Sequence, residues 1–240
     1  MDTARTWELA LPALERHHEV LTPSLAGHAG GPPFDPGAGI GGVLDAIERT
    51  LDDSGVETAH ITGNSFGGYL ALRLAARGRA RSVVAFAPAG GWAQDDESWR
   101  DTLALQAEIH AQTILAAPQA DRILATPEGR RRATTCTTVN FEHIPVELLA
   151  HQLAGVAACA VEPLVANALR EGWPLDAERI TCPVRIVWGT EDRLLPWPSA
   201  AARYREVLPH ADWVVLDGVG HSPQLDVPLE AAQLIVGFTA

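Results

Sequence analysis

The amino-acid sequence predicts an α/β fold in which a mostly parallel β-sheet is flanked by helices. Near both ends of the chain, short apolar runs alternate with segments of helical periodicity, which is typical of consecutive βαβ units. From Ala89 to Ile180 the alternation stops and only helical patterns remain. With 240 residues, of which 47% are hydrophobic, the chain is long enough to bury one large core. We therefore expect a core domain built from residues 1–88 and 181–240, with a helical insertion over residues 89–180.

Periodicity and boundary residues predict the elements of the first part. Leucines at positions 9, 11 and 14, beside Trp7, indicate a short amphipathic helix over residues 5–16. The segment "HEVLTP" (18–23) reads as a brief strand that ends at a proline, and the Gly- and Pro-rich residues 27–42 read as a loop. The further elements expected here are a helix over 43–54, a strand over 56–62, a helix over 66–77 and a buried strand over 81–88.

Two long helical patterns dominate the insertion, and the strand-helix alternation then resumes. The patterns cover residues 99–117 and 146–169. After them we expect a strand over 182–189, a helix over 199–208, a strand over 211–218 and a terminal helix over 227–240.

Composition and charge exclude several classes of partner. A net charge of -12 and a pI near 5.1 would repel nucleic-acid phosphates and anionic membranes. The chain opens with neither a signal-peptide pattern nor an apolar run long enough to span a bilayer. The three cysteines are widely spaced, with no CxxC motif and no histidine at metal-ligand spacing. We expect a soluble cytoplasmic protein with a small-molecule substrate, no metal and no cofactor; the oligomeric state stays open.

The segment "GNSFGG" places Ser65 between Gly63 and Gly67, where an apolar strand turns into a helix. A sharp strand-to-helix turn lifts the serine hydroxyl clear of the backbone, and it requires small neighbours two residues away on each side. Ser65 is therefore our candidate nucleophile. The alternative is that it is only a small residue in a tight turn.

A serine hydroxyl needs a base and an orienting acid, and two later loops offer them. Asp192 follows the strand over 182–189, and His221 follows the last strand. Both loops lie at the carboxyl edge of a parallel sheet, where active-site groups collect. Glu191 and Asp217 are rival acids; we prefer Asp192 because the preceding Gly-Thr allows a turn toward the histidine.

Two other motifs carry weaker signals. "GAGIGG" at residues 37–42 has the spacing of a dinucleotide-binding loop, but "PPFDP" precedes it in place of a strand. "GRRRA" at residues 129–133 is interpreted as a solvated turn, although one of its arginines could bind a substrate carboxylate.

Four motifs in order make the chain resemble the α/β-hydrolase family, and the resemblance covers nearly all of it. "LTPSLAGHAGG" is similar to the turn after the family's fourth strand, "GNSFGG" to its nucleophile elbow, "WGTEDRLLP" to its acid loop and "GVGHSPQLDVP" to its histidine loop. The helical insertion sits where the family has its cap, between the sixth and seventh strands. The resemblance implies a structural role for His28. Haloalkane dehalogenases and epoxide hydrolases of this fold carry an aspartate nucleophile, so Ser65 disfavours both.

The resemblance implies an acyl-transfer site. Ser65 would attack a carbonyl with His221 as base, Asp192 would hold the imidazole, and the backbone N–H of Phe66 would be one oxyanion donor. The cap would shape an apolar pocket. Its lining could include Trp92, Trp99 and Trp173, or these side chains only pack the cap helices.

The sequence departs from the family at its start. Family members begin with two or three further strands, and a His-Gly loop after the third supplies the second oxyanion donor. "TARTW" (3–7) already corresponds to the segment entering the first helix, so neither has a counterpart here. The missing strand is a central one, and its absence would open a gap in the sheet. Either the natural protein begins upstream of Met1, which the intact motifs favour, or it is a truncated member with impaired catalysis.

Three functions are consistent with these residues. The first is a serine hydrolase that cleaves an ester, thioester or lactone of a small apolar substrate through an acyl-enzyme. The second is a carbon-carbon bond hydrolase of ring-fission dienones, because that subfamily has a similar elbow. The third is a catalytically impaired binding protein that retains the fold.

Overall fold

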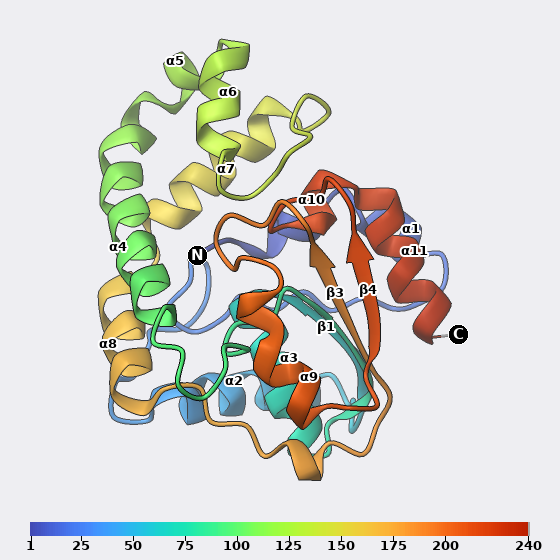
Figure 1. Ribbon diagram of the computed structural model, residues 1–240. Coiled ribbons are helices and arrows are strands. Elements are labelled where there is room, and N and C mark those ends of the chain that lie inside the picture. The colour runs from blue at the N-terminus through green and yellow to red at the C-terminus, as the bar shows by residue number, and fades with distance from the viewer. Residues whose placement is uncertain (240) are drawn as a thin grey trace.

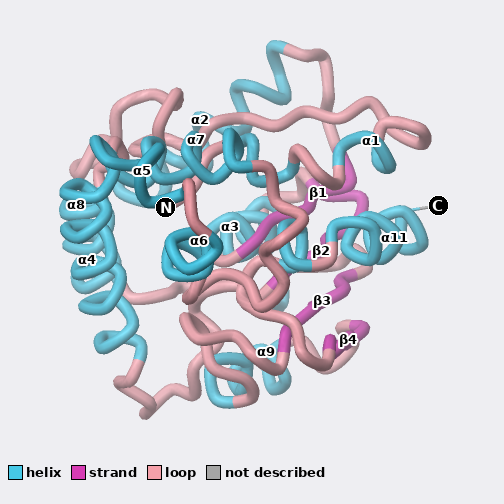
Figure 2. Tube along the Cα trace, turned by 90° about the horizontal axis from the view of Figure 1, so that it is seen from above, coloured by secondary structure: helices cyan, strands magenta, loops and turns pink. Residues whose placement is uncertain are grey.

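A four-stranded parallel sheet forms the centre of the computed structural model, which describes residues 1–239. The strands stand in the order β1 (Ala59–Asn64), β2 (Ala80–Phe86), β3 (Val184–Gly189) and β4 (Asp212–Leu216). All three pairings are parallel, with Gly63 opposite Ala85 and Trp188 opposite Val215. Helices cover both faces of the sheet (Figures 1 and 2). The expected α/β architecture with a parallel sheet is confirmed.

Alternating side chains of the buried strand β2 feed two apolar cores, one on each face of the sheet. Val83 and Ala85 pack into the larger core, beneath α2 (Gly39–Asp53), α3 (Phe66–Ala76) and α9 (Ala202–Val207). Val84 and Phe86 pack into the other core, beneath α1 (Leu11–Leu14) and α11 (Pro228–Thr239). β2 is apolar on both faces because it is covered on both faces.

The helices of the middle of the chain are inserted between β2 and β3. They stand beside and above the carboxyl ends of the strands (Figure 1). Their own apolar cluster includes Phe141, Leu148 and, from the loop after β4, Leu225. The inserted elements are α4 (Trp99–Ala116), the short 3-10 turn η2 (Ala117–Gln119), α5 (Ala120–Leu124), α6 (Pro127–Thr134), α7 (Val146–Ala157) and α8 (Val161–Glu171).

Short elements complete the chain. Three further 3-10 turns are η1 (Ala4–Trp7), η3 (Ala177–Arg179) and η4 (Ser199–Ala201), and α10 (Pro223–Asp226) lies in the loop after β4. Within residues 1–239, no helix is by itself both long and apolar enough to cross a membrane. α7 and α8, which are bent by 63° at the break between them, reach that length and apolarity only as a pair.

The structure differs from the sequence prediction in the first part of the chain. The helix expected over 5–16 is broken into η1 and α1, because Pro12 lacks an N–H and its ring would clash with the carbonyl four residues earlier. The strand expected over 18–23 does not form. A strand needs a hydrogen-bonded neighbour, and a cavity separates this segment from β1.

The loop expected over 27–42 is also shorter than predicted. α2 begins at Gly39, four residues before the predicted start of its helix at Val43. Asp35 and Ala38 accept the first backbone hydrogen bonds, from Gly39 and Gly42. Residues 1–38, which the structure describes in full, form no strand, so the dinucleotide-like glycine spacing here lacks the strand that a phosphate-binding loop follows.

Candidate active site

Ser65 occupies the junction between β1 and α3 in a strained backbone conformation, with φ 56° and ψ -118°. Non-glycine residues rarely adopt positive φ, and such strain concentrates at functional sites. Three backbone hydrogen bonds hold it: Ser65 N donates to Phe86 O at 2.9 Å, and Ser65 O accepts from Tyr69 N at 3.0 Å and from Ala89 N at 3.1 Å. The sheet and the helix together fix the turn that presents this side chain.

The glycines around Ser65 are not equivalent. A Cβ atom added to Gly63 would lie 2.2 Å from the carbonyl oxygen of Gly67, so only glycine fits there. A Cβ added to Gly67 meets nothing within 4 Å, which corrects the expectation that both neighbours must be small. The second crowded position is Gly68, whose added Cβ would lie 3.1 Å from Pro88.

Asp192 and His221 are joined by a hydrogen bond of 2.7 Å between Oδ2 of the carboxylate and Nδ1 of the imidazole. Both side chains are buried. The other carboxylate oxygen of Asp192 accepts backbone N–H bonds from Leu194 at 2.9 Å and Leu195 at 2.7 Å. The rival acids Glu191 and Asp217 are both exposed. The turn after β3 thus aims Asp192, rather than either rival, at the histidine.

One cavity of about 1110 Å³ is lined by Ser65, Phe66 and His221. Within residues 1–239 no hydrogen bond joins the Ser65 hydroxyl to His221, and such contacts often tighten only when substrate binds. Phe66 is the first residue of α3, where a backbone N–H has no partner within the helix. The N–H of Phe66 is therefore free to meet a developing oxyanion.

The three tryptophans that the sequence offered as candidate lining do not line this cavity. Trp92 is buried in the larger core, and Trp99 and Trp173 pack against it. Trp173 meets Tyr69 edge to face, with ring centroids 5.2 Å apart. They therefore contribute to packing, whereas Trp7 from η1 does line the cavity.

Asn64 connects the serine turn to the histidine loop, and the sequence did not single it out. Its amide nitrogen donates to His221 O at 2.8 Å and to Phe86 O at 3.2 Å. Its oxygen accepts from Ser222 Oγ at 3.3 Å and from the buried Gln224 at 3.1 Å. Only its position directly before Ser65 could have indicated such a role.

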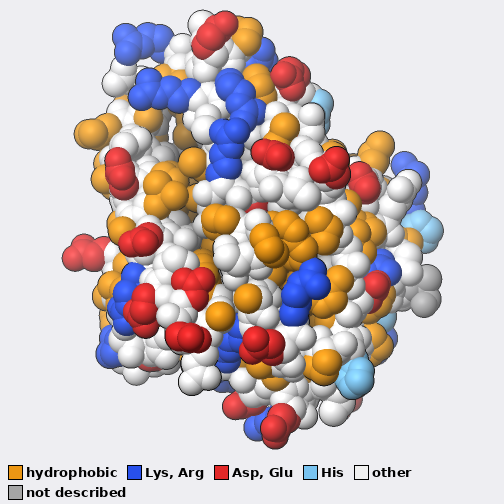
Figure 3. Space-filling view, in the orientation of Figure 1, with side chains coloured by type: hydrophobic (Ala, Val, Ile, Leu, Met, Phe, Trp, Pro, Cys, Tyr) orange, Lys and Arg blue, Asp and Glu red, His pale blue; other side chains and the backbone are white. Residues whose placement is uncertain are grey.

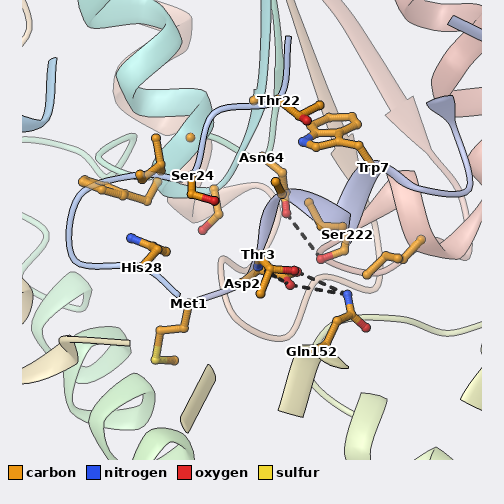
Figure 4. Close-up of a pocket in the computed structure, with 18 of the residues that line it drawn as sticks. Met1, Asp2, Thr3, Trp7, Thr22, Ser24, His28, Asn64, Gln152 and Ser222 are labelled. Carbon is orange, nitrogen blue, oxygen red and sulfur yellow. Dashed lines mark hydrogen bonds between the residues drawn. The ribbon is translucent and has the colours of Figure 1, made fainter. Parts of the chain in front are cut away.

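The first residues of the chain also lie in the cavity. Figure 4 shows Asp2 bonded to Gln152, and Thr3 close by. Burial raises the pKa of the Asp2 carboxyl, while a hydrogen bond from the N–H of Thr3 opposes that shift. His28 lies nearby with its ring stacked 6.0 Å from that of Phe66, and burial lowers the pKa of its imidazole to about 4. These groups give the cavity a polar wall that the sequence did not predict.

The parallel sheet, the strained serine turn and the buried acid-histidine pair define an enzyme of the α/β hydrolase class. The chain belongs to the alpha/beta hydrolase family, whose model matches residues 2–234.

The chain is similar to characterised proteins in sequence and in structure. The chain is 34% identical over 205 residues to the epoxide hydrolase EphH of Mycobacterium tuberculosis, which covers 82% of this chain and 92% of the relative. Solved structures that share the fold include two hydrolases. One is 2-hydroxy-6-oxo-6-phenylhexa-2,4-dienoate hydrolase from a Rhodococcus species, at TM-score 0.74 and 21% identity over 100% of this chain and 86% of that one. The other is an esterase from Thermogutta terrifontis, at TM-score 0.69 and 19% identity over 98% of this chain and 85% of that one.

Proposed function

We propose that the protein is a serine hydrolase that cleaves an ester, thioester or lactone of a small apolar substrate through an acyl-enzyme. One observation carries the proposal: Ser65, in a strained turn, shares a cavity with an imidazole that a buried carboxylate holds. Hydrolase activity is common to the family. The catalytic residues and the substrate class are our inference, and Ser65 in place of an aspartate distinguishes this mechanism from epoxide opening.

In the proposed mechanism His221 Nε2 removes the proton from Ser65 Oγ while Oγ attacks the carbonyl carbon. The backbone N–H of Phe66 donates to the oxyanion that forms. When the carbon-to-leaving-group bond breaks, protonated His221 returns its proton to the departing alkoxide or thiolate. Water activated by the same imidazole then releases the acyl group. Asp192 fixes the tautomer with the proton on Nδ1 and stabilises the charged imidazolium.

A fluorophosphonate probe tests the proposal directly. We expect the wild-type protein to be labelled at Ser65 and the Ser65→Ala variant not to be. Ser24→Ala is the matched control, because Ser24 lines the same cavity but lies outside the strained turn. Labelling that persists in Ser65→Ala contradicts the assignment of the nucleophile. A well-folded wild-type protein that remains unlabelled would favour the third function, a binding protein that retains the fold.

A carbon-carbon bond hydrolase is the second candidate, and Arg132 favours it. This side chain comes from α6 and lines the cavity that holds Ser65. A guanidinium there can bind a substrate carboxylate with two parallel hydrogen bonds. Turnover of a ring-fission dienone that falls in Arg132→Met, while p-nitrophenyl acetate turnover stays, would support this function over the ester hydrolase. Styrene oxide in the same panel tests for epoxide hydrolysis, the activity for which the Mycobacterium tuberculosis relative is named.

A further inference from the structure

The carboxylate of Asp226 lies where the helical insertion meets the histidine loop. Asp226 ends α10, and its side chain is 2% exposed. Oδ2 accepts hydrogen bonds from the backbone N–H of Gly220 at 2.6 Å and of Val139 at 2.9 Å. Oδ1 accepts from the backbone N–H and the side-chain amide of Asn140, at 2.7 and 2.8 Å. Only an ionised carboxylate, which is acceptor-only, can satisfy all four donors at once.

Arg131 holds the same segment of the insertion from the opposite side. Its guanidinium donates to the carbonyl oxygens of Val139 at 2.7 Å and Thr138 at 3.1 Å. Two consecutive peptide groups therefore lie between a cation and an anion, with their carbonyls toward Arg131 and their N–H groups toward Asp226. Both peptide dipoles have the favourable orientation, and charge-assisted hydrogen bonds are stronger than neutral ones. We call Arg131, residues 138–140 and Asp226 the clamp.

The clamp reaches the backbone on both sides of His221. Before it, the N–H of Gly220 is held by Asp226. After it, the N–H of Ser222 donates to Thr137 O at 2.9 Å, in the segment that leads into the clamp. The core itself holds His221 through two hydrogen bonds: the amide of Asn64 donates to its carbonyl, and its ring Nδ1–H donates to Asp192. The backbone of the histidine loop is thus anchored partly to the insertion that covers the cavity.

We propose that Asp226 is a positioning residue that couples the helical insertion to His221. Through Gly220 and the clamp it fixes the backbone that aims the imidazole at Ser65. How well the His221 side chain is held in place therefore depends on where the insertion sits over the cavity. Asp226 takes no part in the bond-making steps. The proposal rests on the proposed function for its kinetic consequence, whereas the coupling itself is structural and is measurable without catalysis.

Asp226→Asn is the main kinetic test. The variant keeps the side-chain size but places an N–H group among four donors, which forces the histidine loop to shift. With p-nitrophenyl acetate we expect kcat to fall about 100-fold, the typical cost of a misplacement of about 1 Å, and KM to change less than about 3-fold. Asp53→Asn, an exposed aspartate at the end of α2, is the matched control and should leave both constants unchanged. A folded Asp226→Asn with wild-type kcat overturns the proposal.

Arg131→Gln removes the two hydrogen bonds that Arg131 donates to residues 138 and 139, and it leaves the Asp226 carboxylate unchanged. We expect a smaller loss of kcat, about 10-fold, and a double variant no slower than Asp226→Asn, because both residues act through the same segment. Losses that multiply independently would contradict coupling through the clamp. If Asp226→Asn does not fold, Arg131→Gln and Asn140→Ala still decide the matter: wild-type kcat in both overturns the proposal.

Amide hydrogen exchange separates the coupling from the proposed function. In Asp226→Asn we expect the amides of Val139, Asn140 and Gly220 to exchange faster together, while those of the sheet keep their wild-type protection. In Arg131→Gln the amide of Gly220 should also exchange faster, although Arg131 does not contact it. Faster exchange at 139 and 140 with Gly220 unchanged in Arg131→Gln overturns the coupling. A wild-type protein without fluorophosphonate labelling refutes the hydrolase assignment alone, because the exchange measurement needs no activity.

Discussion

Asp192 carries two tasks at once, since one oxygen faces His221 and the other accepts two backbone N–H groups. In Asp192→Asn the amide oxygen would keep the backbone donors, and the NH2 group would face Nδ1. This arrangement favours the imidazole tautomer that carries its proton on Nε2, which cannot accept the proton of Ser65. We expect kcat for an activated ester to fall roughly 1,000-fold or more with little change in fold, measured by steady-state kinetics and circular dichroism.

The two rival acids provide the matched controls for Asp192→Asn. Glu191 is its exposed neighbour, and Asp217 is an exposed carboxylate that accepts a hydrogen bond from the hydroxyl of Thr190 at 3.3 Å. Glu191→Gln and Asp217→Asn should each retain at least half of the wild-type kcat. A larger loss in either control than in Asp192→Asn would show that the acid has been assigned to the wrong residue.

His28 makes stability depend on pH in the acid range. Burial lowers the pKa of its imidazole from 6.5 to about 4 in the folded protein. Between these values the unfolded chain binds the proton and the folded protein does not, so stability is lost as pH falls from 6.5 toward 4. Between pH 7 and pH 4, wild type should lose about 3 kcal/mol more free energy of unfolding than His28→Gln, measured by urea denaturation at each pH. His17→Gln, which changes an exposed histidine, is the control and should lose as much free energy of unfolding between pH 7 and pH 4 as wild type does. An equally large loss in His28→Gln would contradict the assignment of this pH dependence to His28.

At the scale of elements, the turn from β1 to α3 depends on Gly63 more than on Gly67. Gly63→Ala forces a Cβ to 2.2 Å from a backbone oxygen that cannot move without breaking the turn. We expect a loss of about 3 kcal/mol in the free energy of unfolding. Gly67→Ala has open space in a helix and should be neutral or stabilising by about 0.5 kcal/mol. Urea denaturation of both variants checks this; equal destabilisation would mean that the turn needs small residues on both sides.

Local patterns predicted elements well where local and tertiary preferences agree. The helix expected over 99–117 appears as α4 (Trp99–Ala116), and the strand expected over 81–88 appears as β2 (Ala80–Phe86). The pattern over 146–169 is split into α7 and α8 where Ala160 N donates to Gly27 O, a contact far away in the sequence. The strand expected over 18–23 fails for a related reason, because periodicity carries no information about a pairing partner.

At the scale of the whole molecule, the residues of the candidate site could be selected from the sequence, but their support could not. Ser65, Asp192 and His221 each follow a recognisable strand, so parallel topology predicts that they meet at one edge. The wall formed by Asp2 and His28, and the clamp at Asp226, depend on contacts between segments far apart in the chain. No local pattern encodes such contacts. Figure 3 shows acidic and basic side chains on the same face of the molecule.

The sheet ends at β1, whose outer edge is paired with no other strand among residues 1–239. All six residues of β1 line the large cavity, and residues 18–25 lie across it. The amide of Ser65 donates to Phe86 O in β2, and that of Ala59 donates to Arg79 O directly before β2. By strand alternation the amides of Ile61 and Gly63 face β2 as well. The amides of His60 and Thr62 face the open edge.

An open edge exposes backbone groups to exchange and to pairing with another strand. We expect the amides of His60 and Thr62 to exchange about 100-fold faster than those of Ile61 and Gly63, measured by two-dimensional NMR in deuterated water. The comparison is internal to one strand, so differences in global stability cancel. Matching protection on both edges would mean that another polypeptide segment or a second molecule pairs with β1 in solution. Thr62→Pro, compared with Thr62→Ala, then distinguishes the two edges. Both variants lose the hydrogen bond from Thr62 Oγ1 to Val84 O at 2.9 Å, whereas only the proline removes the outward-facing N–H.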